Sequence, residues 1–165
     1  MRLFVSALGM AMVGLYALAA AANQDEVKPQ LVQQMEACGL DSAIYEILPY
    51  LTPVELGGDF DGDGALDLAA PVSRKHDGKR GVALCRAGTL LDVVGMSGRM
   101  GENLGAAYFD SIDWWALHQG AAEQGASEGP PPELIGDAIT IGKFGSSSAL
   151  IYWTGTNYSG YWQGD

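Results

Sequence analysis

A short acidic segment contains the residues of this chain best suited to hold a metal ion. Its carboxylates alternate with glycines and small residues, and they are Asp59, Asp61, Asp63 and Asp67. Like charges placed this close together repel one another unless a cation lies among them. Carboxylate and carbonyl oxygens are the ligands that calcium prefers in proteins. The segment 59–67 therefore predicts a calcium site.

The spacing of these residues matches the first part of a calcium loop. In such a loop the side chains at positions 1, 3 and 5 point inward, position 6 is glycine, position 7 offers its carbonyl and position 9 often acts through water. These positions are Asp59, Asp61, Asp63, Gly64, Ala65 and Asp67. Position 12, a bidentate Glu in an EF-hand, is Ala70, and the run 66–72, which contains Pro71, predicts a strand where an EF-hand has a helix. The loop is therefore not an EF-hand.

The stretch from Gly58 to Ala69 closely resembles the calcium loop of FG-GAP repeats, the units of integrin-type β-propellers, in which the loop runs directly into a strand. The resemblance implies side-chain ligands at Asp59, Asp61, Asp63 and Asp67 and a carbonyl ligand at Ala65. A propeller needs about four to eight blades, and the chain has one such loop. We therefore expect a single blade-like sheet. The alternative is an acidic, glycine-rich hairpin loop that binds no ion.

The first 22 residues have the features of a secretory signal peptide. Arg2 precedes an apolar run over residues 3–18, and Ala20 and Ala22 form an A-x-A cleavage site. We expect residues 1–22 to be removed and the protein to be periplasmic or secreted. The alternative is an uncleaved anchor, for which the run is short against a span of about 20 residues. No later segment predicts a membrane span.

Composition limits the partners of the remaining chain. Residues 23–165 suit one domain with a core of its own. The formal net charge of the whole chain is −11, which argues against binding to nucleic acid, because phosphates would be repelled.

The chain has two cysteines, Cys38 and Cys85, which lie far apart and lack the spacing of a metal site. In an oxidising compartment they predict one disulfide, which would join the N-terminal helix to the sheet. The alternative is a pair of buried free thiols.

Apolar periodicity and turn signals predict an α+β domain in which an N-terminal helix packs on an antiparallel β-meander sheet. The helix is expected over residues 27–37, followed by a short helix or turn and an extended segment over 41–56. Residues 119–136, rich in Gly, Ala, Glu and Pro, predict a flexible surface loop. The strands, all in one sheet, are expected at 66–73, 80–86, 89–96, 108–117, 137–143, 148–153 and 157–162.

Two further residue groups bear on function. Aromatic residues concentrate in the last third of the chain, where an exposed row would suit a carbohydrate or protein partner. The alternative, which we favour for most of them, is packing in the core. Outside the acidic loop, a pair of carboxylates could serve glycoside hydrolysis. The candidates for such a pair are Glu102, Asp110, Asp113 and Asp137.

The sequence as a whole favours an exported, non-catalytic calcium-binding protein, either a binding module or an interaction module. Because no Glu stands at position 12, we expect weak binding, with a dissociation constant on the order of 0.1 to 1 mM. The alternatives are a secreted hydrolase with a structural calcium loop, and a cell-envelope protein that adds its sheet edge to a partner.

Overall fold

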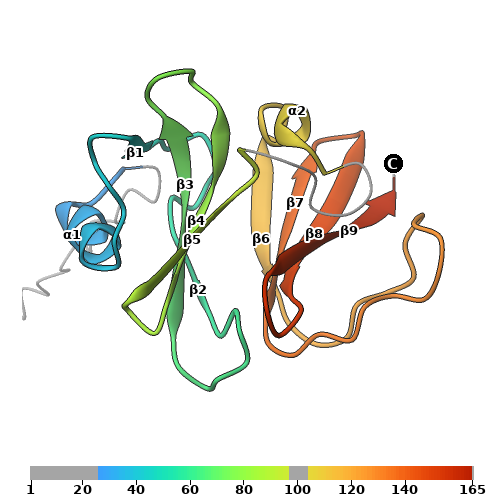
Figure 1. Ribbon diagram of the computed structural model, residues 1–165. Coiled ribbons are helices and arrows are strands. Elements are labelled where there is room, and N and C mark those ends of the chain that lie inside the picture. Colours follow the sequence, from blue (N-terminus) through green and yellow to red (C-terminus); the bar gives the residue numbers. More distant parts are fainter. Residues whose placement is uncertain (1–25, 97–103, 165) are drawn as a thin grey trace, which may run out of the picture.

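The computed structural model describes residues 26–96 and 104–164 as a single small domain that is mostly β, with two antiparallel sheets and two short helices (Figure 1). The predicted signal peptide, residues 1–22, lies outside the described residues. Among the residues described, no helix has the length and apolar character needed to cross a membrane.

The first sheet contains the predicted meander and two additional short strands. The meander consists of β3 (Asp67–Arg74), β4 (Arg80–Arg86) and β5 (Leu90–Val94). β1 (Tyr45–Ile47) and β2 (Leu56–Gly58) pair with different halves of one edge of β3. Pro71 lies between those halves, where its missing N–H costs no ladder hydrogen bond. β1 and β2 were not predicted, because only an extended lead into the acidic loop was expected there.

The second sheet has the order β6 (Trp114–His118), β7 (Ala138–Lys143), β8 (Ser147–Trp153) and β9 (Tyr158–Gly164). The two hairpins expected near the C-terminus are confirmed as β7–β8 and β8–β9. Glycine in the left-handed region at Gly145 and Gly155 marks their turns.

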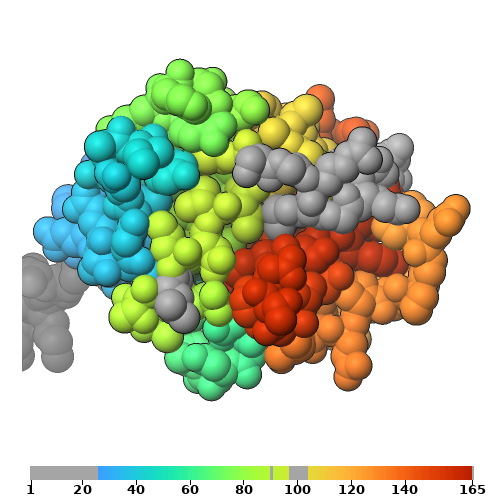
Figure 2. Space-filling view, viewed as in Figure 1, coloured from blue at the N-terminus to red at the C-terminus, as the bar shows by residue number. Residues whose placement is uncertain are grey.

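The expectation of one blade-like sheet is wrong, because β6 pairs with β7 and not with β5. Both sheets carry apolar side chains that have to be covered, and each sheet covers the other. In Figure 2 the part of the chain that forms the first sheet, from cyan to yellow-green, lies directly against the part that forms the second, in orange and red. The main buried cluster joins Leu56, Ala69, Val82 and Leu84 of the first sheet to Trp115, Ile139, Ile141, Ala149, Ile151 and Tyr158 of the second.

The predicted strand over residues 108–117 is also partly wrong. A one-turn helix, α2 (Ala106–Phe109), occupies its first part, and β6 begins only at Trp114. Phe109 and Ile112 are both buried in the main cluster. Their spacing of three residues suits a helical turn and not the alternation of a strand.

The other face of the first sheet has its own buried cluster. It contains Leu31 and Met35 of α1 (Pro29–Ala37) with Ala70, Val72 and Ala83 of β3 and β4. The disulfide expected between Cys38 and Cys85 is present and joins the end of α1 to β4. Because both faces of β3 and β4 are buried, their sequences are continuously apolar instead of alternating.

The segment 119–136 has no helix or strand, as expected, but it packs along the outer face of the second sheet. The Gly125 N–H donates to the hydroxyl of Tyr161 at 2.8 Å, and the Ala126 N–H donates to the Gln163 carbonyl at 3.2 Å. Ala122 and Leu134 pack against a small cluster that includes Leu150. That this segment is flexible stays a prediction.

Tyr50 is partly buried at the edge of the main cluster. Its hydroxyl donates to the Gly81 carbonyl at 3.0 Å, and the Arg80 guanidinium lies 4.7 Å from its ring centroid. Burial raises the pKa of Tyr50 well above its ordinary value, although the Arg80 cation opposes the shift.

We therefore expect the protein to lose stability as the pH rises above about 10, where an unfolded tyrosine ionises. Folded Tyr50 keeps its proton in that range, so its contribution is complete below the unfolded pKa and is lost as the pH rises toward the folded pKa. Urea unfolding at about pH 8 and about pH 11 measures the loss. The Tyr50→Phe variant should lose less stability between the two pH values; an equal loss would contradict this explanation.

Candidate metal centre

The acidic loop connects β2 to β3 and is closed by strand pairing. Gly58 lies opposite Asp67 in the antiparallel register, so the two ends of the loop are adjacent. Between them Gly62 and Gly64 adopt φ angles of +76° and +84°, a region that glycine enters without strain. A Cβ at Gly62 would also lie 2.6 Å from the Ile135 carbonyl oxygen. The sharp path of the loop thus requires glycine at both positions.

Three of the predicted ligands converge. One carboxylate oxygen from each of Asp59, Asp61 and Asp67 lies within 4.8 Å of the others, as in a site able to hold a cation. Asp63 is outside this group, and its Oδ1 accepts a hydrogen bond from the Ala65 N–H at 2.7 Å. At such distances each pair of like charges repels by roughly 1 to 4 kcal/mol, depending on the effective dielectric constant. A cation among them would remove that cost.

Backbone N–H groups hold the carboxylates in place. Asp59 accepts from Gly62 at 2.8 Å and from Gly64 at 3.0 Å, which folds the loop around its side chain. Asp61 accepts from Asp63 at 3.3 Å. These hydrogen bonds leave each carboxylate oxygen with a further lone pair.

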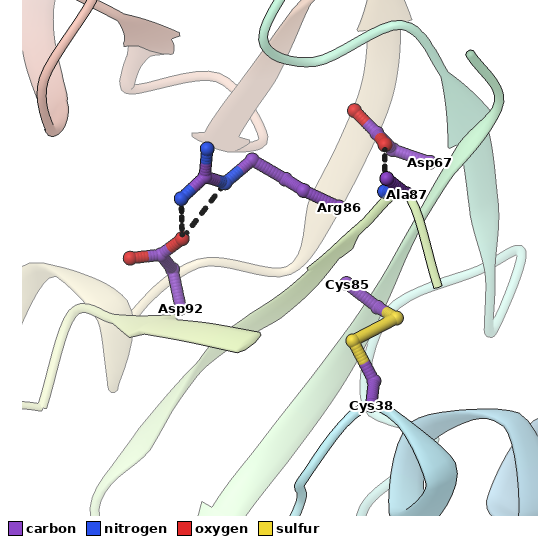
Figure 3. Close-up of a disulfide and its surroundings, with 6 residues drawn as sticks. All are labelled: Cys38, Asp67, Cys85, Arg86, Ala87 and Asp92. Atoms are coloured by element: carbon purple, nitrogen blue, oxygen red, sulfur yellow. Dashed lines mark hydrogen bonds and ion pairs between the residues drawn. A yellow bond between two sulfur atoms is a disulfide. The ribbon is translucent and has the colours of Figure 1, made fainter. Parts of the chain in front are cut away.

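Asp67 is the most deeply placed of the three carboxylates. It is fully buried at the start of β3, and it accepts from Phe60 N–H at 2.8 Å. It also accepts from Ala87 N–H at 2.9 Å (Figure 3). Burial raises the pKa of Asp67, the two N–H groups lower it, and the charges of Asp61 and Asp63 raise it further. A buried carboxylate facing other carboxylates is the arrangement that a bound cation would stabilise most.

An arginine from β4 faces the loop. Arg86 donates to Asp61 at 3.2 Å. Both its Nε and a terminal nitrogen contact Asp92 at 3.0 Å (Figure 3). Its guanidinium also stacks over the ring of Trp153 at 4.2 Å from the centroid. Arg86 thus connects the acidic loop to β8 of the second sheet.

Two more groups complete the surroundings. Asp137 forms a double contact with Asp59: its N–H donates to the Asp59 carbonyl at 2.6 Å, and its Oδ2 accepts from the Asp59 N–H at 3.0 Å. The hydroxyl of Tyr158 is buried without a hydrogen-bond partner among the described residues. Burial raises the pKa of Tyr158, Arg86 opposes the shift, and the charge of Asp67 adds to it.

The sequence did not indicate these neighbours. Arg86 is 25 residues from Asp61, and Asp137 is 78 residues from Asp59, so no spacing rule links them to the loop. Asp137, one of the four candidates for a hydrolytic carboxylate pair, contacts the backbone of the loop at Asp59. Of the other candidates, Asp110 accepts from the Arg80 N–H and Asp113 from the Phe144 N–H, while Glu102 lies outside the described residues.

Comparisons of the chain with protein-family models, with curated proteins and with solved structures give no match. The chemistry of the acidic loop is therefore argued from its own residues. Three carboxylates in one place, with a single arginine beside them, offer hard oxygen ligands suited to calcium or a similar cation.

Proposed function

We propose that the protein is an exported, non-catalytic calcium-binding protein whose ion is held by the loop between β2 and β3. The observation that carries this proposal is the convergence of Asp59, Asp61 and Asp67, one of them fully buried, where Arg86 is the one cation that contacts them among the described residues and it contacts only Asp61. Asp63 and the Ala65 carbonyl complete the ligand set implied by the likeness to FG-GAP loops. Water would fill the remaining positions.

The role of the ion would be structural. Calcium would offset the repulsion among the carboxylates and fix the loop at the start of β3, a strand that is central to the first sheet. Export is supported by the predicted signal peptide and by the disulfide, which is the form expected in an oxidising compartment. No contact in the described residues favours the hydrolase alternative over this role.

Calcium should stabilise the folded protein, because an ion that binds only the native state adds its binding free energy to that of folding. With a dissociation constant on the order of 0.1 to 1 mM, about 10 mM calcium should add about 1.4 to 2.7 kcal/mol to the free energy of unfolding. Thermal and urea unfolding with calcium or with EDTA measure the difference. Isothermal titration gives the affinity directly.

Asp61→Asn should abolish both the stabilisation and the heat of binding. Asp113→Asn is the matched control, since it removes the same charge from an exposed position directly before β6 and should leave the calcium response intact. Unchanged unfolding in calcium together with no titration heat would refute the proposal. A nanomolar dissociation constant would show that ligands from other parts of the chain take part.

A further inference from the structure

The outer face of the second sheet has an open groove that the calcium proposal does not involve. It has a volume of about 520 Å³, within the range of about 300 to 1,000 Å³ typical of small-molecule sites. It lies where the β7–β8 turn and the end of β9 meet, at the opposite end of the molecule from the acidic loop (Figure 1). The residues that line it are Trp114, Lys143, Phe144, Gly145, Ser146, Ser147, Ser148, Gln163 and Gly164.

The floor of the groove is a row of small residues. Strand register places Trp114 opposite Gly142, Gly142 opposite Ser148 and Ser148 opposite Gly164. Three of these four positions have little or no side chain, so the sheet surface is hollow across three strands. The fourth, Trp114, fills one end of the hollow.

Trp114 lies flat on this floor. A Cβ at Gly142 would come within 2.5 Å of two carbon atoms of the indole, so the ring rests directly on the glycine backbone. The ring is half-buried, and its indole N–H has no acceptor among the described residues. Phe144, which is 75% exposed, stands beside it with the ring centroids 6.2 Å apart and the planes inclined by 38°. Together the two rings form a shallow aromatic surface.

Polar groups with unused hydrogen-bonding capacity surround these rings. Within the described part of the chain, no hydrogen bond or ion pair engages the hydroxyls of Ser146, Ser147 and Ser148, the amide of Gln163 or the ammonium of Lys143. These groups offer donors and acceptors in one small area. No carboxylate is among the lining residues, although the chain carries a net charge of −11.

We propose that this groove binds a neutral glycan, with one pyranose ring stacked on Trp114. The C–H groups on a pyranose face carry partial positive charge and complement the negative face of an aromatic ring. The hydroxyls at the sugar's edge match the serines, Gln163 and Lys143, which would also fix its orientation. A hydroxyl-rich ring is the ligand that uses both parts of the groove at once.

Other occupants fit less well. A lipid surface would leave the serine hydroxyls and the Gln163 amide without partners, at a cost for each desolvated group. A stable protein partner needs about 800 Å² of surface per side, far more than the area around two rings and one turn. The proposal does not depend on calcium, because the groove and the acidic loop share no residue.

The test is a titration of the mature protein, residues 23–165, with cellohexaose, maltohexaose, chitohexaose and mannohexaose, followed by calorimetry and by tryptophan fluorescence. At least one sugar should bind with a dissociation constant on the order of 0.1 to 1 mM, as expected for a shallow site with few anchors. Binding should be equal in calcium and in EDTA. The calcium proposal can therefore fail without affecting this result, and the reverse also holds.

Three variants locate the site. Trp114→Ala should weaken binding by at least about tenfold. Gly142→Ala should do the same although it removes no aromatic group, because the added methyl displaces the indole. Ile44→Ala, which truncates an exposed apolar side chain near the first sheet, should bind normally. Thermal unfolding of each variant verifies that it is folded, and Phe144→Ala, at an exposed position, provides a second test if Gly142→Ala does not fold.

The proposal is overturned if none of the four sugars binds, or if Trp114→Ala and Phe144→Ala bind as well as the unmodified protein. It is also overturned if phosphatidylcholine vesicles change the tryptophan fluorescence while no sugar does, since the occupant would then be a lipid surface.

Discussion

Loss of the Cys38–Cys85 disulfide should lower the free energy of unfolding by about 4 kcal/mol. The bond closes a loop with a sequence separation of 47, and restricting the unfolded chain over that length gives an estimate of this size. The effect should be large for this protein, because small domains have a total stability of only about 5 to 15 kcal/mol. The double variant Cys38→Ala/Cys85→Ala is preferred to serine, since both sulfurs are buried and a hydroxyl there would be desolvated.

Urea unfolding of the unmodified protein with and without dithiothreitol, compared with the double alanine variant, measures the effect. The reduced protein and the variant should unfold at similar urea concentrations, and dithiothreitol should not change the variant. If reduction leaves the midpoint of the unmodified protein in place, the bond contributes nothing to stability. All four tryptophans belong to the second sheet, so fluorescence and circular dichroism together reveal whether both sheets unfold in one transition.

The elements predicted correctly from the sequence are those specified by neighbouring residues. The meander β3–β4–β5 and the hairpins of β7 to β9 have apolar strands separated by short turns containing glycine, such as Gly78 and Gly145. Their pairing is local, and local patterns therefore suffice. The helix α1 follows from apolar residues at helical spacing after an early proline.

The elements that were missed depend on distant parts of the chain. β1 and β2 have three residues each and lie among prolines, and they are strands only because the edge of β3 supplies their partners. The division into two sheets is decided by which apolar faces cover one another, and alternation along a strand does not specify that choice.

In the candidate site, too, the local features were predicted and the contacts with distant residues were not. The spacing predicted that Asp59, Asp61, Asp63 and Asp67 converge, and all but Asp63 do so, because the loop is short and is closed by one hairpin. Arg86 and Asp137 come from strands that the loop meets only in the folded protein. The contact of the Trp114 ring with Gly142 likewise depends on the register of β6 and β7. The sequence contains both residues but does not show that they lie opposite each other.

Phe60→Ala should destabilise the protein by about 3 to 5 kcal/mol and should also remove most of its response to calcium. Phe60 stands between Asp59 and Asp61 in the sequence. Its side chain nevertheless is only 1% exposed and belongs to the main cluster between the sheets. Its N–H donates to Asp67, and its ring is packed so closely that a Cβ at Gly58 would lie 2.9 Å from it. The ring therefore anchors the loop to the core.

Truncation of this ring leaves a cavity that the hairpin cannot close, because β2 is held by its pairing with β3. The loop then loses the anchor that fixes the spacing of its carboxylates, although no proposed ligand has changed. Urea unfolding in calcium and in EDTA measures both effects. Phe144→Ala is the matched control, since that ring is 75% exposed and its loss should change the free energy of unfolding by no more than about 0.5 kcal/mol. Phe60→Leu should recover part of the stability and of the calcium response together; recovery of stability with no recovery of calcium binding would show that the ring does not position the ligands.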